Sequence, residues 1–476
     1  MFESAPRGLT TSLETLRCLG PWGYLTASVA VASLILLPTF YNLFFHPLRK
    51  VPGPLLARFS QSWRNHKYFR GTWHDDAIEL HRKYGNVVRI APDEVSFVDA
   101  AALKALYGHG QKVVKSKWYD TWIVPNMTVS FFAATDIKQH RHLRSRVSGA
   151  YSMTAILSME PLIQDVARDM WRKMGEFADE GTPVPMHDWA NFFAFDVVGT
   201  LAMGGPIGFI ERGIDVDGII RSIHDGFWMM ANMGNMPLQM FWFNNPVVQW
   251  ALKNFGGKRL AAFSLFLNWL DNRVEERYRN GLGDKRRDLL QLFIDAKDIS
   301  GNPVKKGDVM IEGVNILGAG ADTTTIGILA TLGAILHRPH AARRLQAELD
   351  EAYERLGIDG VLDDIPYTEL AKLPYLSAII KESTRLHPSI QYQLPRVVPK
   401  GGVMVGPHQV PEGMICSISP TTMNRSKEIF GPDADEWNPQ RWIPERVDDE
   451  ERIKIWTSQL TTASRSPPLP NSPPNG

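Results

Sequence analysis

The segment from Asp308 to His337 has the periodicity of one long helix with an unusual middle. At 1.5 Å per residue such a helix is about 45 Å long, enough to pass through a whole domain. Its middle reads GAGADTTTIG, and each glycine costs a helix about 1 kcal/mol relative to alanine. A carboxylate among apolar residues is costly unless it is paired or used. The segment therefore predicts a long helix that crosses the protein and carries glycines and a carboxylate at its centre.

Three residues in this segment suggest a site. Gly320 lacks a side chain, so a flat group can approach the backbone there. Asp322 and Thr323 place a carboxylate and a hydroxyl beside that gap. A second membrane-spanning helix is one alternative, which Glu312 and Asp322 disfavour because charges are costly in a bilayer. A buried Asp–Thr pair that only satisfies its own hydrogen bonds is the other, and the segment alone leaves it open.

The N-terminal region contains an uncharged stretch from Cys18 to Phe45. About 20 apolar residues span a bilayer as a helix, so we expect a membrane anchor over residues 22–45, after a short lumenal segment over residues 1–21. Basic residues are more numerous after the stretch than before it, which places the rest of the chain on the cytosolic side. A cleaved signal peptide would have a shorter apolar region. A buried core helix is the remaining alternative.

The rest of the chain predicts a mostly helical domain with a small β-sheet, an α+β class, over residues 46–445. Helical periodicity covers residues 136–152, 160–180, 261–280, 340–355 and 374–387. Two β-rich runs split by Pro92-Asp93 predict a hairpin within residues 84–99, and more strands are expected over 397–418. After Glu445 a charged run gives way to proline and serine, so residues 446–476 are predicted to be a disordered tail.

Composition excludes some classes of function. With 52 Lys and Arg against 51 Asp and Glu, the net charge of +1 gives no electrostatic reason to bind nucleic acid. The two cysteines, Cys18 and Cys416, argue against a disulfide framework.

Residues 227–243, FWMMANMGNMPLQMFWF, are rich in methionine and aromatic residues. They suit an apolar substrate entrance or a bilayer contact, and an ordinary core explains them equally well.

Glu382 and Arg385 lie three residues apart, on one face of the predicted helix over 374–387. Such a pair is usually on the surface and contributes under about 1 kcal/mol. Here it is part of the apolar run LPYLSAIIKESTRL, which favours a buried pair with a further partner. Arg441 in NPQRWIP is the candidate, because a guanidinium group binds a carboxylate as a fork.

Taken together, AGADTT, ESTR and NPQRW resemble, in this order, the haem-thiolate monooxygenases of the cytochrome P-450 superfamily. FFHPLRKVPGP, YGNVVRIAPDEVSF and IFGPDADEWNPQRW are similar to its membrane-bound fungal members, including pisatin demethylase-like enzymes. The likeness runs from about Tyr41 to Glu445. It implies the cytochrome P-450 fold and insertion of one oxygen atom of dioxygen into a lipophilic small molecule, in fungal secondary metabolism.

The resemblance also implies cofactors, partners and a location. The cofactor is haem b, and NADPH electrons come from a separate NADPH–cytochrome P-450 reductase, since the chain has no flavin or dinucleotide fingerprint. The axial thiolate of the family favours cleavage of the O–O bond. The location is the endoplasmic reticulum membrane, with a single span and the catalytic domain in the cytosol. No nucleic-acid partner is expected.

Residue roles follow from the same resemblance. Asp322 and Thr323 match the acid and the alcohol that relay protons during catalysis. Glu382, Arg385 and Arg441 match the buried Glu-Arg-Arg cluster that holds the fold beneath the haem. The positions that match haem contacts are His140, Arg144, Ala319, Gly320 and Arg396. Without the resemblance, RHLRSR would be interpreted as a solvated basic helix face.

The metal ligand is the point at which the sequence departs from the family. In the family it is a cysteine in a glycine-rich loop that follows the Pro-x-Arg motif. Cys416 precedes Arg441, and Cys18 lies at the anchor, so we assign no metal ligand and expect a fold truncated at the C-terminus.

Two explanations stay open for this departure. One is an enzyme whose reading frame or gene model is altered at the 3′ end, and the other is a non-catalytic relative that acts by binding or does not fold stably. A membrane-anchored structural protein is a third class. It would leave the Asp322–Thr323 pair without a purpose.

Overall fold

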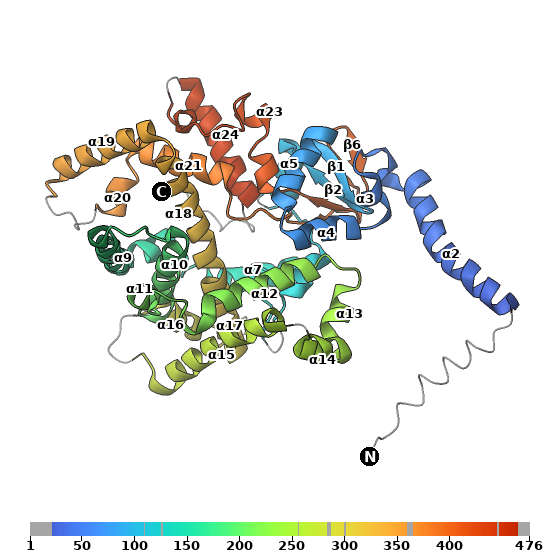
Figure 1. Ribbon diagram of the computed structural model, residues 1–476, viewed down its shortest axis with the longest axis horizontal. Coiled ribbons are helices and arrows are strands. Elements are labelled where there is room, and N and C mark those ends of the chain that lie inside the picture. Colours follow the sequence, from blue (N-terminus) through green and yellow to red (C-terminus); the bar gives the residue numbers. More distant parts are fainter. Residues whose placement is uncertain are drawn as a thin grey trace, which may run out of the picture.

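The computed structural model describes residues 21–464 apart from 109, 125–126, 256, 283–286, 299–300, 359–364 and 445–446. Helices make up most of these residues, and a five-stranded sheet and a two-stranded sheet complete the fold. The helices α9, α10 and α11 lie at one side of the molecule, the strands β1 and β2 lie at the other, and α18 runs between them (Figure 1). The predicted α+β class is confirmed.

Most predicted helices form close to their expected bounds. They are α9 (Glu160–Glu180), α15 (Gly257–Asn280), α19 (Pro339–Leu356) and α21 (Pro374–Leu386). The helix predicted over 136–152 forms as α7 (Ile137–Val147) and ends earlier than expected. Proline in the first turn of α9 and α19 needs no N–H partner, and its backbone angle already suits a helix. Both helices end at a glycine in the left-handed conformation, Gly181 and Gly357. These local signals explain why the sequence placed both ends well.

The long helix predicted over 308–337 forms one rod with an altered middle. It consists of α17 (Lys306–Val314), the π-helical turn η4 (Asn315–Ala319) and α18 (Gly320–Leu336). A π turn widens a helix by one residue and is frequent at functional sites. Gly318 lies in this turn, where an added Cβ would come within 2.6 Å of Cζ of Phe227. Gly318 thus lets the ring of Phe227 lie against the helix, whereas the approach of a flat group at Gly320 stays a prediction.

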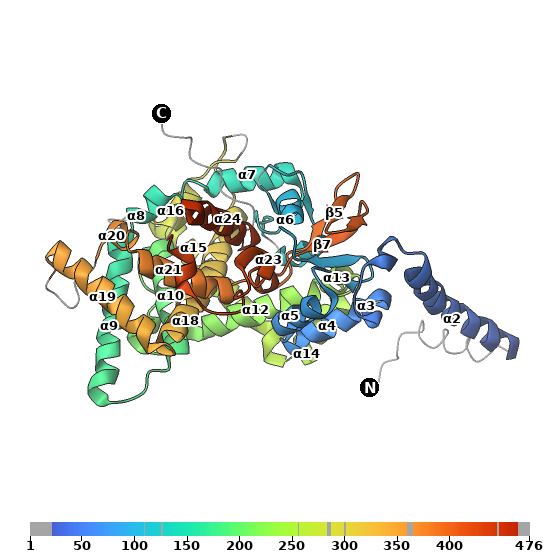
Figure 2. The same cartoon turned by 90° about the horizontal axis from the view of Figure 1, so that it is seen from above.

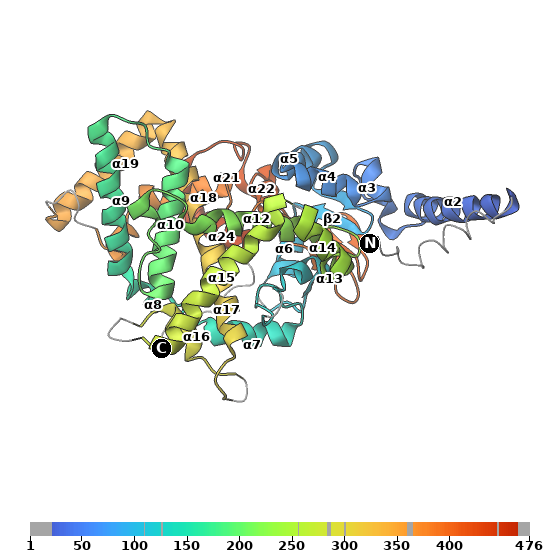
Figure 3. The same ribbon diagram turned by 60° about the horizontal axis from the view of Figure 1, so that its bottom comes forward.

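The largest apolar core surrounds this rod. It joins α10 (Met186–Met203), α12 (Ile219–Met233), α15 and α17 through side chains that are fully buried, among them Phe195, Ile223, Phe266 and Val309. Figure 3 shows α15 running beside α12 and α17, which agrees with the contacts between these helices. The core fixes α12 and α18 relative to each other.

The predicted hairpin is present as β1 (Val87–Ala91) and β2 (Glu94–Phe97), which pair antiparallel. The five-stranded sheet has the order β1-β2-β7-β4-β3, and its remaining strands are β7 (Ile415–Ser417), β4 (Arg396–Val397) and β3 (Val114–Lys115). The two-stranded sheet pairs β5 (Val403–Val405) with β6 (His408–Val410). The register of β3 on β4 sets Lys115 opposite Arg396, so two cationic residues are neighbours at the edge of the sheet.

The prediction of disorder after residue 445 is wrong for its first part. Val447–Ser464 form a helix, α24, which contacts α6 (Ala100–Tyr107) and α22 (Pro420–Met423) and lies close to α23 (Lys427–Phe430) (Figure 2). Trp456 on α24 is 6% exposed and packs against Phe430 and Trp442. The charged run masked this helix, although Ile453 and Trp456 have the spacing of an apolar face. Residues 465–476 lie outside the described residues.

The predicted anchor over residues 22–45 coincides with α2 (Pro21–Phe44), which extends away from the rest of the chain (Figure 1). Among its described side chains, Leu36, Leu37 and Phe40 are more than half exposed. By length and composition, one helix among the described residues could cross a membrane, and it is the rod Lys306–Leu336. The α18 part of that rod runs between the helices α9–α11 and the strands β1 and β2 (Figure 1). The anchor stays a prediction.

Candidate functional site

A cavity of about 700 Å³ lies against the centre of the rod. Its walls are mainly aromatic and aliphatic, and they include Trp118, Trp122, Phe131, Phe132, Phe227 and Ile326. Ligand cavities typically combine such an apolar lining with a few polar groups. Here Ala319, Gly320, Asp322 and Thr323 share one wall, so four of the predicted site residues face the same space.

The acid and the alcohol on this wall have different partners. Oγ1 of Thr323 donates to the backbone oxygen of Ala319 at 2.9 Å. Oδ1 of Asp322 lies 2.7 Å from Nε2 of His224 on α12. Asp322 is therefore held by a second helix, and the alternative of a self-contained Asp–Thr pair does not describe the site. His224 was missed because nothing in the sequence links two residues 98 positions apart.

A cationic group lies at a second, smaller cavity of about 110 Å³, whose lining includes Lys115, His140 and Arg396. The side chain of Arg396 donates to the hydroxyl of Tyr119 at 2.8 Å, and Lys115 donates to backbone oxygens. These uncharged partners neutralise neither cation. Nε2 of His140 is buried without a partner among the described residues.

The charges in this group oppose one another. Burial, followed by the charges of Arg396 and Arg144, holds the pKa of Lys115 well below its usual value. Burial and the charges of Lys115, Arg144 and Arg396 lower the pKa of His140 to about 4. Cations gathered in a partly buried place are stabilised by anions that bind between them. The structure thus brings together the predicted residues His140, Arg144 and Arg396, and adds Lys115, which the sequence reasoning missed.

Haem b has a flat apolar ring and two carboxylates, and part of its expected surroundings is present. The cationic group suits the two carboxylates. The turn at Gly318–Gly320 forms a wall of the large cavity and carries only one small side chain, which suits a flat ring. The residues described here therefore fit the ring and its carboxylates.

An axial thiolate does not come from the described residues. Cys416 is the only free cysteine among them, it lies in strand β7, and it is not part of the cavity lining. Burial raises the pKa of its thiol to about 12, which keeps it protonated. This agrees with leaving Cys416 out of the metal site, and Cys18 lies outside the described residues.

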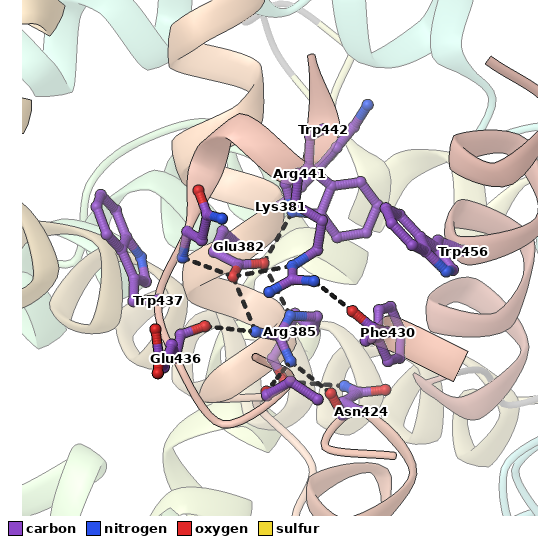
Figure 4. Close-up of polar contacts among 12 residues, drawn as sticks. Lys381, Glu382, Arg385, Asn424, Phe430, Glu436, Trp437, Arg441, Trp442 and Trp456 are labelled. Atoms are coloured by element: carbon purple, nitrogen blue, oxygen red, sulfur yellow. Dashed lines mark hydrogen bonds and ion pairs between the residues drawn. The ribbon is translucent and has the colours of Figure 1, made fainter. Parts of the chain in front are cut away.

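Glu382 and Arg385 on α21 form a fully buried pair (Figure 4). Nε and Nη2 of Arg385 each donate to a different carboxylate oxygen of Glu382 at 2.8 Å. Glu382 also accepts from the backbone N–H of Asn438 at 2.8 Å and from Nε1 of Trp442 at 2.9 Å. The pair thus joins α21 to the segment that follows α23.

Arg441 completes this cluster, but its main partner is a different carboxylate. Nε of Arg441 is 3.4 Å from Oε1 of Glu382, whereas its Nη2 is 2.8 Å from Oδ2 of Asp433. The fork expected between Arg441 and Glu382 is made with Asp433 instead. The three predicted residues lie together, and Asp433 is the member that the sequence reasoning missed.

Comparison with known proteins adds independent findings. The family model described as cytochrome P-450 matches residues 50–455, past Glu445 and into α24. A cytochrome P-450 monooxygenase of Aspergillus terreus is 33% identical over 435 residues, covering 87% of this chain and 84% of the relative. Pisatin demethylase of Fusarium vanettenii is 30% identical over 427 residues, covering 87% and 79%. A crystal structure of a cytochrome P-450 (CYP102L1) superposes with a TM-score of 0.64 at 14% identity, covering 82% and 86%.

Proposed function

The chain belongs to the cytochrome P-450 family of haem-dependent monooxygenases, and we propose that it inserts one oxygen atom of dioxygen into a lipophilic small molecule. The family uses haem b and receives NADPH electrons through a redox partner. The observation that carries the proposal is the large apolar cavity with Asp322 and Thr323 in its wall. The likeness to fungal monooxygenases supports a role in secondary metabolism. The non-catalytic alternative gains no support, because these relatives are named as monooxygenases.

The haem would be held from two sides. When bound, it supplies the redox chemistry that activates dioxygen. Arg396, Lys115 and Arg144 would pair with its carboxylates, which would relieve the repulsion among these three side chains, and the neutral imidazole of His140 would donate a hydrogen bond to a carboxylate. The backbone of η4 and the start of α18 would face the ring. The electron donor that we propose is an NADPH–cytochrome P-450 reductase.

The chain's own residues would select and orient the substrate. The aromatic walls of the cavity remove apolar surface from water, at roughly 25 cal/mol per Å² of substrate surface. The polar groups of the lining are few, and two of them are already engaged. Oγ of Ser389 donates to the backbone oxygen of Thr323 at 2.8 Å, and Asp322 is paired with His224. A substrate with mainly apolar surface suits such a cavity.

We propose that Thr323 holds a proton donor at the cavity wall. Its hydroxyl now donates to Ala319 and can turn about the Cα–Cβ bond to face the cavity. Replacing Thr323 by alanine should leave the binding of haem and substrate unchanged and divert NADPH electrons into hydrogen peroxide. General acid–base groups contribute about 10²–10⁴-fold, so we expect peroxide to account for most of the NADPH consumed.

Thr324 is the matched control for this experiment. Its hydroxyl also donates to a helix carbonyl, that of Gly320 at 2.8 Å, but Thr324 is exposed and is not part of the cavity lining. The measurement is peroxide released per NADPH oxidised, with reductase present. It uses an extended enzyme form in which the cysteine loop of a related monooxygenase is joined after α24, so that this helix and the contacts of Trp456 are kept. If Thr323→Ala, Thr324→Ala and the parent release equal amounts of peroxide per NADPH oxidised, the role of Thr323 is refuted.

We also propose that α2 is a single membrane anchor in the endoplasmic reticulum, with the domain in the cytosol. The exposed apolar side chains of Leu36, Leu37 and Phe40 support this proposal, because an isolated helix with such a surface is unfavourable in water. Carbonate extraction of membranes should leave the expressed chain in the pellet, whereas a chain without residues 1–45 should be released. Release of the full chain would mean that α2 does not span the membrane.

A further inference from the structure

Two hollow regions of the molecule lie on either side of the contact between His224 and Asp322. The inner one is the large apolar cavity, and its lining includes Asp322. The outer one has a volume of about 600 Å³, and its lining is rich in polar residues, among them His187, Asp188, Asp215, Arg221, His224 and Asp225. His224 belongs only to the outer lining and Asp322 only to the inner one. The 2.7 Å contact between Nε2 and Oδ1 therefore connects the two regions.

We infer that His224 is a positioning residue that orients Asp322 and passes protons to it from the solvent in the outer pocket. This inference rests on the proposed function, in which protons are consumed at the cavity wall. In the transfer, the Nε2–H bond of the imidazolium breaks and an Oδ1–H bond forms on Asp322. Asp322 then passes this proton on to the cavity, and a hydronium ion from the outer pocket protonates the imidazole again at Nε2, so one proton has moved inward, one water molecule is left in the outer pocket and both side chains have regained their starting charge.

Exposure and reach suit this role. The side chain of His224 is 43% exposed, whereas that of Asp322 is 22% exposed. The imidazole can thus contact water, while Asp322 is among the residues that line the apolar cavity. Histidine is the side chain whose ordinary pKa allows it to gain and lose a proton near neutral pH.

The charges around His224 favour its protonated form. The hydrogen bond to Asp322 raises the pKa of His224 above its ordinary value, burial opposes this rise, and the charges of Asp215 and Asp225 add to it. Nε of Arg221 lies 3.7 Å from Oδ2 of Asp225, and its positive charge offsets part of the negative charge of that carboxylate. The other titratable groups of the outer pocket, His187 and Asp188, come from α10.

The direction of the pH dependence follows from the raised pKa. The ion pair contributes fully to stability below about pH 6.5, the ordinary histidine value, and this contribution is lost as the pH rises through the folded value. The supply of protons to Asp322 should fall over the same range. If the contact between His224 and Asp322 only holds α12 and α18 together, the share of NADPH electrons lost as peroxide should not change with pH in this way.

The first test needs neither haem nor substrate. The pKa of His224 is measured by NMR of the full chain labelled at histidine, with His224→Gln to assign its signal. We expect a value above 6.5 in the parent and a lower value in Asp322→Asn. If the titration of His224 is unaffected by Asp322→Asn, the two residues are not coupled and the inference is overturned.

The second test distinguishes a proton relay through His224 from a purely structural contact. His224→Gln retains a side-chain N–H that can reach Asp322 but cannot carry a proton in this pH range. In the extended, haem-loaded enzyme, we expect peroxide per NADPH to rise with pH in the parent. In His224→Gln it should be at least several-fold higher at acidic pH and independent of pH. His187→Gln, in the same outer pocket, should follow the parent.

The outcomes distinguish this inference from the proposed function. Parent-like coupling and pH profile in His224→Gln would leave only a structural role for His224 and overturn the relay, with the monooxygenase function intact. If the extended parent forms no oxidised product from any lipophilic compound tested, the proposed function fails and the relay fails with it. In that case the NMR result still decides whether the His224–Asp322 pair is coupled.

Discussion

Replacing Arg385 by alanine should leave very little folded protein. The guanidinium of Arg385 is fully buried, and besides Glu382 it donates to three backbone oxygens, those of Asn424, Ala434 and Glu436. The variant removes all these donors and leaves Glu382 without its main countercharge (Figure 4). Breaking a buried pair from one side typically costs about 3–5 kcal/mol, a large share of a total stability of about 5–15 kcal/mol.

The measurement is the yield of soluble chain and its urea unfolding midpoint. Arg355→Ala is the matched control, because Arg355 makes a comparable 3.1 Å contact with Glu369 on the surface. That loss should be under about 1 kcal/mol. Arg385→Lys should fall between the two, since lysine keeps the charge but not the fork. A normal yield and midpoint in Arg385→Ala would show that the cluster does not hold this part of the fold.

Replacing Trp456 by alanine should detach α24 from the domain. The indole packs against Phe430 and Trp442 with ring centroids 5.8 Å away in each case, and its Nε1 donates to the backbone oxygen of Ile429 at 2.6 Å. Truncating a buried tryptophan costs about 3–5 kcal/mol, through lost apolar contact and the cavity left behind. For a single helix near the end of the described chain, this is enough to favour local unfolding.

Limited proteolysis of the variant should therefore cut within Val447–Ser464 at protease concentrations that leave the parent intact. Ile455→Ala is the control on the same helix, since Ile455 is 51% exposed and its truncation should change little. Equal resistance of Trp456→Ala and the parent would mean that α24 does not depend on this contact. Rapid cutting of the parent itself would restore the original prediction of a disordered tail.

The sequence by itself determined the features whose causes lie within a few residues. The bounds of α9 follow from Pro161 in the first turn and Gly181 after the last residue, so the predicted bounds, 160–180, match the observed ones. The same holds for the hairpin β1–β2 and for the pair Glu382–Arg385, whose members are one helical turn apart. Such features need only helix or strand geometry, and periodicity and turn residues report that geometry directly.

The tail shows where composition misled. The charged residues of VDDEER and the prolines after them indicated disorder, because composition measures whether a segment can form a core of its own. Trp456 is buried although its own segment forms no core, because Phe430 and Trp442 from other elements supply the apolar surface against which it packs. The burial of a segment is a property of its partners as well as of its own residues.

Only the tertiary structure decided how the site is assembled. Lys115 joins Arg396 because of the register between β3 and β4, and the contact of His224 with Asp322 depends on how α12 packs beside α18. The fork of Arg441 turned to Asp433 because the loop after α23 places that carboxylate nearer than Glu382. Contacts between residues far apart in the chain are set by the packing of whole elements, and that packing minimises the free energy of many side chains at once. Periodicity along the chain carries no record of it.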